Sequence, residues 1–515
     1  MWCNTQVTYS PTTKNSRSES ELEANPLDPR NLVGASKRFI DPTKYKFTLA
    51  AYASFDGGES WTEAPPLQLL SNWAGISDPA IAWDNAGNCY LVALPFPPAG
   101  NSTHGIAVYK SSDGGLSWSS PSLIHTSSGD DKQWATGDRN TGSRFFGNVY
   151  AAWDDGSSLA FARTTDQGAT WRGTGTQPAG SVLAVGDSFA PVIAVANDGA
   201  VYIFWLATNV IKYVKSIDGG NSFTIPPRTA VSGLTSISAV LPRAPDFSKF
   251  PGTTFRVMTL PTACCGSARN VVVAWADYRE GVSRIYYRRS SDGGTTWVGA
   301  TSGQPLLTRV GAPGSDQHDF HPQLASTPSG AIACSYYELG PKWSGAPPWI
   351  NVMIATSQNA GASFLDVDKV SNVPWDPAVN APLSHGMAGT TFIGEYFGLA
   401  ASSAGFVPFW TDTRTGMQEI FSGRKMTIGP WNGVQFQGKL PAGSTRRWFT
   451  FNWPACWHVV WEIVPITPRV GAPQIKWRVQ VERATSGTIT YWLKVTNLTG
   501  RDVDIEGRYS ILAAD

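Results

Sequence analysis

A short turn pattern recurs along the first four fifths of the chain and constrains the fold more than any other feature. Its clearest copy is SSDGGLSW at residues 111–118, and each copy follows an apolar, aromatic-rich run. In such a turn the aspartate accepts hydrogen bonds from the turn's own backbone, the glycines supply positive φ, and the closing aromatic packs between sheets. The pattern therefore predicts strand-to-strand turns whose central polar residues are Asp56, Asp113, Asp166, Asp218, Asp292 and Asn359.

The spacing of these turns predicts the architecture. Successive copies lie about 61 residues apart on average, which is enough for four short strands and is in the range of a propeller blade. A further unit, from about residue 395 to residue 428, has the strand pattern but lacks the turn. Counting it predicts an all-β fold with a seven-bladed β-propeller; a six-bladed ring is the alternative. The 51 glycines and 36 prolines are typical of many short strands joined by tight turns.

Two further segments complete the predicted domain organisation. The last repeat is one outer strand short, and a strand over residues 4–10 could pair with its outside and close the ring. After residue 430 the repeat stops, and longer strands alternate apolar and polar residues in the manner of half-buried antiparallel sheets. The predicted domains are a propeller over residues 1–430 and a small C-terminal β-sandwich over residues 431–515, with Trp461 and Trp477 on its buried face.

Charge and composition exclude several classes of protein. The formal net charge is +1, which gives no field to attract nucleic acid, so no nucleic-acid partner is predicted. No apolar run approaches ~18 residues, so no membrane span is predicted, and no signal peptide is visible. The six cysteines show no zinc-binding spacing. The adjacent Cys264 and Cys265 could form a vicinal disulfide or remain two reduced thiols.

The repeats resemble the Asp-boxes, or BNR repeats, of the sialidase superfamily over roughly residues 20–428. The phrases NPLDPRNLV at 25–33, AWADYRE at 274–280 and FIGEY at 392–396 are similar to those of bacterial exported propellers described as sialidase-like, without demonstrated activity. This resemblance implies an extracellular or cell-surface location and a glycan or extracellular protein as partner. It also implies that the six Asp-box residues are structural.

Propeller geometry places the candidate functional site away from these turns. The turns lie on one face of the ring, and ligands usually bind in the central funnel of the other face, near the starts of inner strands and the ends of second strands. The candidate catalytic residues there are Asp78, Asp187, Glu395, Tyr396, Arg279 and Arg414. The candidate binding residues are Asp131, Lys132, Trp134, Asp277, Tyr278, His318, Asp319, His321 and Asp412, with Trp492 on the outer face of the C-terminal domain. No cofactor is predicted, although such carboxylates are compatible with a divalent cation such as calcium.

The sialidase mechanism fits these residues poorly. It needs three arginines that clamp the substrate carboxylate, a tyrosine nucleophile activated by glutamate, and an aspartate as acid and base. The first-blade Arg-Ile-Pro motif of the superfamily is replaced by RFI at residues 38–40. Glu395 and Tyr396 are adjacent on a strand and therefore point to opposite sides. Convergence of Arg38, Arg279 and Arg414 would be required.

Other chemistries remain open. A carboxylate pair could combine Asp78 with Asp187 or Glu395, whereas a lyase would need histidine or tyrosine beside a neutralising arginine. The leading hypothesis is a non-catalytic glycan- or protein-binding or assembly module, with self-assembly as a further role. The alternative is a glycoside hydrolase or polysaccharide lyase, with a true exo-sialidase least favoured. Trp492 shares its face with Lys494 and is a candidate sugar contact.

Overall fold

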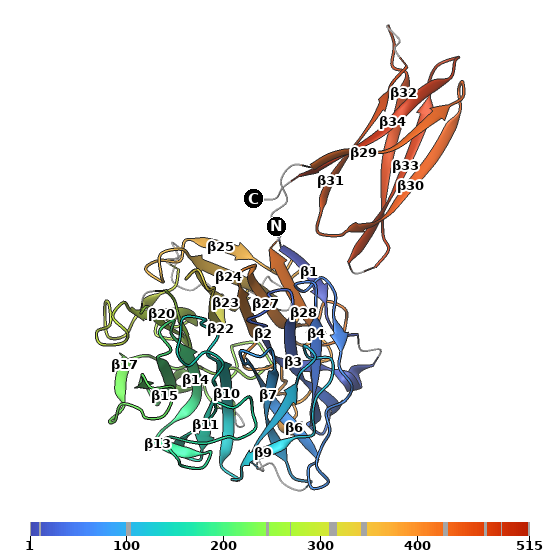
Figure 1. Ribbon diagram of the computed structural model, residues 1–515. Coiled ribbons are helices and arrows are strands. Elements are labelled where there is room, and N and C mark those ends of the chain that lie inside the picture. The colour runs from blue at the N-terminus through green and yellow to red at the C-terminus, as the bar shows by residue number, and fades with distance from the viewer. Residues whose placement is uncertain are drawn as a thin grey trace. The chain divides into compact units, whose positions relative to one another are not determined.

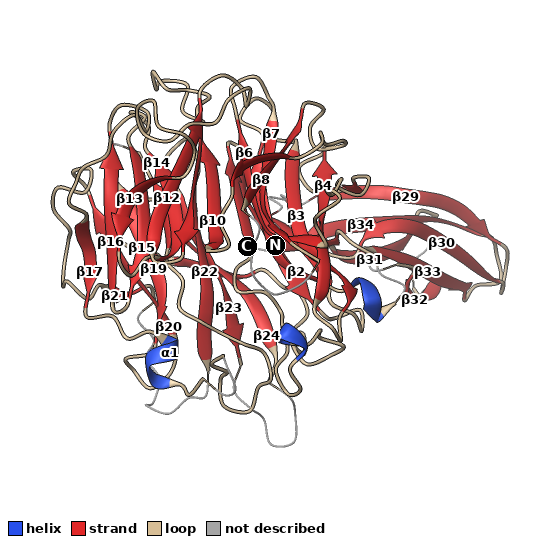
Figure 2. Cartoon of the chain, turned by 90° about the horizontal axis from the view of Figure 1, so that it is seen from below, coloured by secondary structure: helices blue, strands red, loops and turns tan. Residues whose placement is uncertain are grey.

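The structure of the chain is a computed structural model. It describes residues 2–9, 12–98, 105–243, 247–267, 269–307, 317–340, 348–425, 431–467, 471–485 and 487–512. Within these residues the regular structure is almost entirely β (Figure 2). The helices there are the short η1 (Thr13–Asn15), α1 (Ile237–Val240) and η2 (Ser384–Gly386), and none has the length and apolarity needed to cross a bilayer. The chain divides into two compact units, residues 7–424 and residues 1–6 with 425–515. Residues 426–430, where the domain boundary is predicted, lie outside the described residues.

The described residues form seven four-stranded sheets in which consecutive strands pair antiparallel (Figure 1). The first four sheets are β2 (Arg17–Ala24), β3 (Leu32–Asp41), β4 (Lys46–Ser54) and β5 (Thr62–Glu63); β6 (Gly75–Trp83), β7 (Cys89–Phe96), β8 (Ile106–Ser111) and β9 (Ser122–His125); β10 (Asp130–Gly137), β11 (Val149–Asp155), β12 (Ser158–Thr164) and β13 (Ser181–Val185); β14 (Phe189–Val195), β15 (Val201–Ala207), β16 (Val210–Ser216) and β17 (Arg228–Ser232).

The remaining three sheets follow the same order. They are β18 (Thr262–Cys265), β19 (Val271–Asp277), β20 (Arg284–Ser290) and β21 (Gln304–Pro305); β22 (His318–Ser326), β23 (Ile332–Leu339), β24 (Ile350–Ser357) and β25 (Asp366–Lys369); β26 (Gly398–Ser402), β27 (Gly405–Asp412) and β28 (Glu419–Lys425), with β1 (Trp2–Gln6) as the fourth strand beside β28. The unit that lacks the Asp-Gly-Gly turn is therefore a sheet like the others.

The first strands of these sheets form a closed ring. Each of β2, β6, β10, β14, β18 and β22 packs against the first strand of the next sheet, and β26 packs against β2. The ring of four-stranded sheets is consistent with a β-propeller.

The N-terminal segment lies along the outside of the last sheet. Val7 N donates to Ile420 O at 2.8 Å, and Ile420 N donates to Thr8 Oγ1 at 2.9 Å. The strand itself, Trp2–Gln6, begins and ends earlier than the predicted residues 4–10. Val7 and Thr8 still hydrogen-bond to β28 beyond its end, whereas Tyr9 is exposed. Ser10 lies outside the described residues.

The six repeated turns share one hydrogen-bond pattern. At the second of them, Ser111 Oγ donates to Asp113 Oδ1 at 2.8 Å and Ser117 N donates to the same oxygen at 3.0 Å, while Gly115 N donates to Ser111 Oγ at 2.9 Å. Equivalent bonds occur at Asp56, Asp166, Asp218, Asp292 and Asn359. The first turn also contacts the connection between β2 and β3, since Gly57 N donates to Arg30 O at 2.9 Å. These turns thus lie at the ends of the inner strands, away from their starts.

The closing aromatics of the turns pack between sheets. Trp171, for example, lies against a core made by β6 to β8 of one sheet and β10 to β12 of the next. Such interlocking buries much of a large aromatic ring between two sheets and fixes them to one another.

The smaller unit contains two three-stranded sheets that share one core. They are β29 (Trp431–Leu440), β34 (Val503–Leu512) and β31 (His458–Pro465), and β30 (Thr445–Pro454), β33 (Thr488–Asn497) and β32 (Ile475–Arg483). Leu440, Trp461 and Leu493 lie in that core. The prediction that Trp477 is buried is wrong: it is 38% exposed because β32 is an edge strand.

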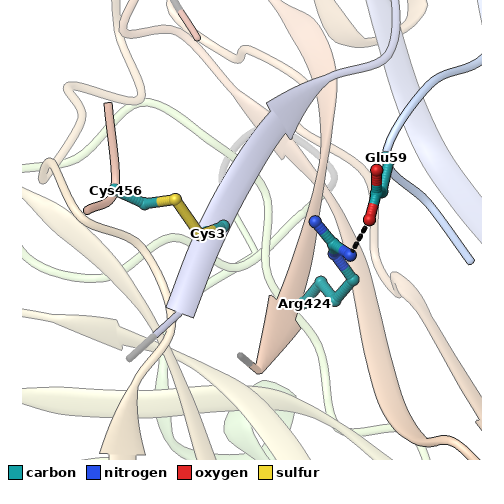
Figure 3. The surroundings of a disulfide bond; sticks show 4 residues. All are labelled: Cys3, Glu59, Arg424 and Cys456. Atoms are coloured by element: carbon teal, nitrogen blue, oxygen red, sulfur yellow. Dashed lines mark hydrogen bonds and ion pairs between the residues drawn. A yellow bond between two sulfur atoms is a disulfide. The ribbon is translucent and has the colours of Figure 1, made fainter. Parts of the chain in front are cut away.

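One disulfide lies within the smaller unit. Cys3 on β1 is bonded to Cys456, with an S–S distance of 2.00 Å (Figure 3). Cys264 and Cys265 are free and buried, so the vicinal disulfide is not formed and the two-thiol alternative holds. Figure 3 also shows the ion pair between Arg424 and Glu59.

Candidate functional site

A β-bulge near the start of five inner strands positions the central side chains. Register shifts in β2, β6, β10, β14 and β22 each contain one non-glycine residue in the left-handed region, with φ between 48° and 53°. Left-handed backbone costs an L-residue of order 1 kcal/mol or more, and a bulge re-aims the side chain it carries. The five residues are Glu19, Asp78, Lys132, Ala190 and His321.

The last inner strand reaches the same place through a glycine. Gly394 has a φ of 95°, and a Cβ atom there would lie only 2.6 Å from the backbone N of Glu19. Only glycine permits this close approach. It brings the next residue, Glu395, beside the side chains of the bulges.

A pocket opens at this level of the ring, with about 510 Å³ of free space, part of it open to solvent. Its walls come from the starts of β10, β14 and β22 and from the segments before β18 and β26. They consist of Lys132, Gln133, Trp134, Ala190, Pro191, Val192, Leu260, Pro261, His321, Pro322, Gln323, Glu395 and Tyr396. The Trp134 and Tyr396 rings meet edge to face with centroids 6.5 Å apart. The pocket thus combines aromatic and apolar walls with a few polar groups, as small-ligand sites do.

A buried chain of alternating charges lies beside the pocket. Lys37 Nζ lies 2.6 Å from Glu19 and 3.5 Å from Asp78. Lys132 Nζ lies 3.9 Å from Asp78 and also pairs with Glu395. Arg256 Nε lies 2.9 Å from Glu395 Oε1. In order of contact the members of this ion-pair chain are Glu19, Lys37, Asp78, Lys132, Glu395 and Arg256, three carboxylates and three cations.

The cations keep two of these carboxylates ionised. Burial alone would raise the pKa of Glu395, but Arg256 and Lys132 outweigh it and hold this pKa at about 2. Lys37 and Lys132 likewise lower the pKa of Asp78 against the effect of burial. A glycosidase acid needs a raised pKa, so neither carboxylate is suited to donate a proton at neutral pH. Burial and Asp78 raise the pKa of Glu19 to about 7, but this residue does not line the pocket.

His321 has free hydrogen-bonding capacity at the pocket wall. Its side chain is buried, and among the described residues neither ring nitrogen has a hydrogen-bond partner. Burial lowers its pKa to about 3, so the ring is neutral near pH 7 and offers one donor and one acceptor. Gln133 Oε1 likewise has no partner in the part of the chain that the structure describes, while Gln133 Nε2 donates to Asp78 O. An unmet buried polar group costs roughly 1–3 kcal/mol, which a hydroxyl-bearing ligand would relieve.

The predicted aspartates near the third and fourth sheets lie outside the pocket wall. Asp131 is exposed, and its Oδ1 accepts a bond from Lys132 N at 2.8 Å. Asp187 is also exposed and accepts a bond from the Thr208 hydroxyl. The predicted pairing of Asp78 with Asp187 is therefore not found at the pocket wall, and Asp78 contacts Lys37 and Lys132 instead.

The predicted arginines are held by their own turns. Asp277 accepts bonds from the Trp275 indole at 2.8 Å and from Arg279 Nε at 2.9 Å. The same arrangement recurs two sheets later, where Asp412 accepts bonds from the Trp410 indole and from Arg414 Nε, both at 2.9 Å. Arg38 pairs with Glu63 at 3.4 Å. None of the three arginines lines the pocket, so the convergence required of a sialidase is not formed.

Most of the predicted histidine and tyrosine group lies outside the pocket wall. His318 stacks on Phe250 with centroids 4.1 Å apart and on Tyr278 at 5.8 Å. Asp319 N donates to Ser283 O at 2.9 Å. Of this group only His321 reaches the pocket.

Several pocket and cluster residues had no part in the prediction. They are Glu19, Lys37, Gln133, Arg256 and Gln323. A recurring proline gives a usable signal for part of the wall, because it follows the wall or bulge residue near the start of three inner strands, at Asp78, Ala190 and His321, and just before a fourth, at Leu260. Arg256 gives no such signal. It lies in the long connection between β17 and β18, where Arg256 N donates to Thr391 O at 3.1 Å.

The buried carboxylate of Asp154, at the end of β11, should make the stability of the protein depend on pH. Burial, together with the nearby Asp131 carboxylate, raises the pKa of Asp154 from 3.8 to about 8, and Asp154 Oδ1 has no partner among the described residues. Because the folded state binds this proton more tightly than the unfolded state, stability should fall as pH rises towards 8. The free energy of unfolding of the wild type should fall between pH 6 and pH 9, and Asp154→Asn should make this fall smaller by about 2 kcal/mol. Urea denaturation at the two pH values measures this, and parallel pH curves for both proteins would contradict it.

Comparisons with known proteins give structural likenesses only. No protein-family model matches the chain, and no curated protein matches it. A protein of unknown function from Dyadobacter fermentans is 15% identical, with 68% of this chain and 97% of that chain covered and a TM-score of 0.42. The NanB sialidase from Streptococcus pneumoniae is 11% identical, with 64% and 66% covered and a TM-score of 0.44. An α-L-arabinanase from Penicillium chrysogenum is 13% identical, with 82% and 98% covered and a TM-score of 0.39. At such TM-scores these likenesses carry nothing about what this chain binds.

Proposed function

We propose that this chain is an extracellular or cell-surface seven-bladed β-propeller with a C-terminal β-sandwich, and that it binds a neutral sugar in its central pocket without cleaving it. The closed ring of seven four-stranded sheets supports the blade count, and the shared core of the two smaller sheets supports the sandwich. The disulfide between Cys3 and Cys456 supports the location, because disulfides persist in oxidising compartments. The proposal includes no cofactor.

The observation that carries this proposal is the chemistry of the pocket wall. Trp134 and Tyr396 offer ring faces and edges on which a pyranose can stack. His321 and Gln133 offer hydrogen-bonding atoms that have no partner within the described ranges and that suit sugar hydroxyls. Both charged groups of the wall, Lys132 and Glu395, are already paired with each other. The wall therefore favours a ligand with hydroxyl groups and no charge.

The same charge pairing supports binding without cleavage. Glu395 is held by two cations and Asp78 by two lysines, so both carboxylates are neutralised by neighbours. A nucleophile or base in such a position would first have to leave its ion pairs. This cost opposes the glycoside hydrolase and polysaccharide lyase alternatives.

Glycan-array screening followed by calorimetry on the full chain tests the proposal. We expect a neutral oligosaccharide to bind, and Trp134→Ala to weaken it at least about tenfold because the stacking surface is lost. Trp349→Ala removes a partly exposed tryptophan that is not in the pocket wall and should leave affinity unchanged.

Two results would overturn the proposal. One is a wild-type chain that binds no neutral glycan on the array, or a Trp134→Ala variant with wild-type affinity. The other is release of shorter sugars on prolonged incubation that a folded Glu395→Gln variant fails to produce, which would establish the enzyme alternative.

A further inference from the structure

Three cations lie in a row across the outer face of the sheet formed by β30, β33 and β32. In the strand register Arg447 is directly opposite Lys494, and Lys494 is directly opposite Arg478. Like charges placed opposite one another on neighbouring strands destabilise a sheet. Among the described residues no carboxylate forms an ion pair with any of the three, whereas Arg508 on the other sheet pairs with Glu506. An unneutralised row of this kind is suited to an anionic partner.

An aromatic row lies next to the cations on the same face. Phe449 is directly opposite Trp492, with ring centroids 5.2 Å apart, and Phe451 lies 6.1 Å from Phe449. Phe449 is 59% exposed and Phe451 is 63% exposed. The Trp492 indole donates to Glu482 Oε2 at 2.8 Å, which orients the ring. The core of this unit lies on the opposite face of the sheet, so these aromatic rings are not needed to fill it.

The two rows are one step apart along the strands. Phe449 is two residues from Arg447 on β30, and Trp492 is two residues from Lys494 on β33, so the rows are separated by about 7 Å. The Arg447 guanidinium itself lies 5.8 Å from the centre of the Trp492 ring. A planar ring stacked on the aromatics would therefore place an attached anionic group near the cations.

We propose that this aromatic and cationic face binds an acidic polysaccharide. Its sugar rings stack on Phe449 and Trp492, and their carboxylate or sulfate groups pair with Arg447, Lys494 and Arg478. Arginine is suited to this because its planar donors bind a carboxylate or sulfate through two parallel bonds. The disulfide of the same unit favours an oxidising compartment, where acidic polysaccharides are surface components. The site is separate in residues and in ligand charge from the central pocket.

The full chain is tested by affinity electrophoresis in gels that contain polygalacturonate, dextran sulfate or neutral dextran. We expect retardation by at least one of the charged polymers, little by dextran, and weakening as salt is raised. The triple variant R447Q, R478Q and K494Q and the single variant W492A should each weaken binding at least about tenfold. Binding to polygalacturonate alone identifies a carboxylate ligand, and binding to dextran sulfate alone identifies a sulfate ligand; both support the proposal.

Matched control variants distinguish binding at this face from nonspecific attraction to positive charge and from binding in the central pocket. The triple variant K439Q, R501Q and R508Q removes the same charge from elsewhere in the smaller unit and should bind as the wild type does. Trp134→Ala should also leave this binding unchanged, so failure of the pocket proposal does not affect it. Equal losses in both triple variants, wild-type binding by W492A, or tighter retention of single-stranded oligothymidylate than of either polymer would overturn the proposal.

Discussion

Replacing Glu395 by alanine should destabilise residues 7–424 by about 3–5 kcal/mol, because it leaves Arg256 and Lys132 without their shared partner inside the protein. Both cations would then be buried with incomplete neutralisation, and Lys132 would keep only the longer contact to Asp78 at 3.9 Å. The free energy of unfolding, measured by urea denaturation, gives the size of the effect.

A matched surface pair provides the control for this change. Glu59 pairs with Arg424, but the two side chains are 56% and 30% exposed, so Glu59→Ala should cost less than about 1 kcal/mol. The double variant Glu395→Met with Arg256→Met removes a buried pair together and should recover part of the loss. Equal effects of Glu395→Ala and Glu59→Ala would show that the ion-pair chain is not a major contributor to stability.

The second large effect is expected at Asp277. Its fully buried carboxylate accepts bonds from the Trp275 indole, from Arg279 N at 3.0 Å and from Arg279 Nε. Asp277→Ala leaves the buried Trp275 indole and the half-buried Arg279 donors without this acceptor and should cost about 3 kcal/mol in the free energy of unfolding, measured by urea denaturation. Asp412→Ala should cost a similar amount, because Asp412 makes the equivalent bonds in another sheet.

Two further variants serve as controls for Asp277→Ala: a double variant with Asp412→Ala in another sheet, and Asp41→Ala in an exposed turn. The two alanine substitutions lie in separate sheets, so their effects should add in the double variant. Asp41 accepts bonds from Thr43 and lies 3.8 Å from the exposed Lys44 Nζ, so Asp41→Ala should cost only about 0.5 kcal/mol or less. A loss at Asp277 no larger than that at Asp41 would mean that the tryptophan and arginine find other partners, and would reopen a ligand-binding role for Arg279.

The repeated turns made the sheets predictable from sequence, because their chemistry is local. Each turn needs only a hydroxyl, an aspartate or asparagine and one or two glycines within six residues, and the strands on either side follow from apolar runs. The sheet formed by β26 to β28 could be predicted from its strand pattern even though it lacks the turn. The disulfide could not, because Cys3 and Cys456 are 453 residues apart and nothing local relates them.

The candidate site was predictable to the extent that position on an inner strand decides where a side chain lies. Lys132, Trp134, His321, Glu395 and Tyr396 were selected for that reason, and they line one pocket. The position of a residue on its strand does not predict which other residue its charged side chain pairs with. Arg256 reaches Glu395 from a long connection, and Arg279 turns back to the aspartate two residues before it. The first is a tertiary contact without a sequence signal, whereas the repeated Trp-x-Asp-x-Arg spacing indicates the second.

The bulged inner strands separate the demands of folding from the choice of recognition chemistry. At five equivalent positions the backbone has nearly the same left-handed geometry, yet the side chains are two acids, a lysine, an alanine and a histidine. The scaffold therefore specifies where a group is presented and leaves its chemical nature open. A lineage of such rings could change specificity through single substitutions at these positions, with asparagine at Ala190 among the least strained because it tolerates left-handed backbone.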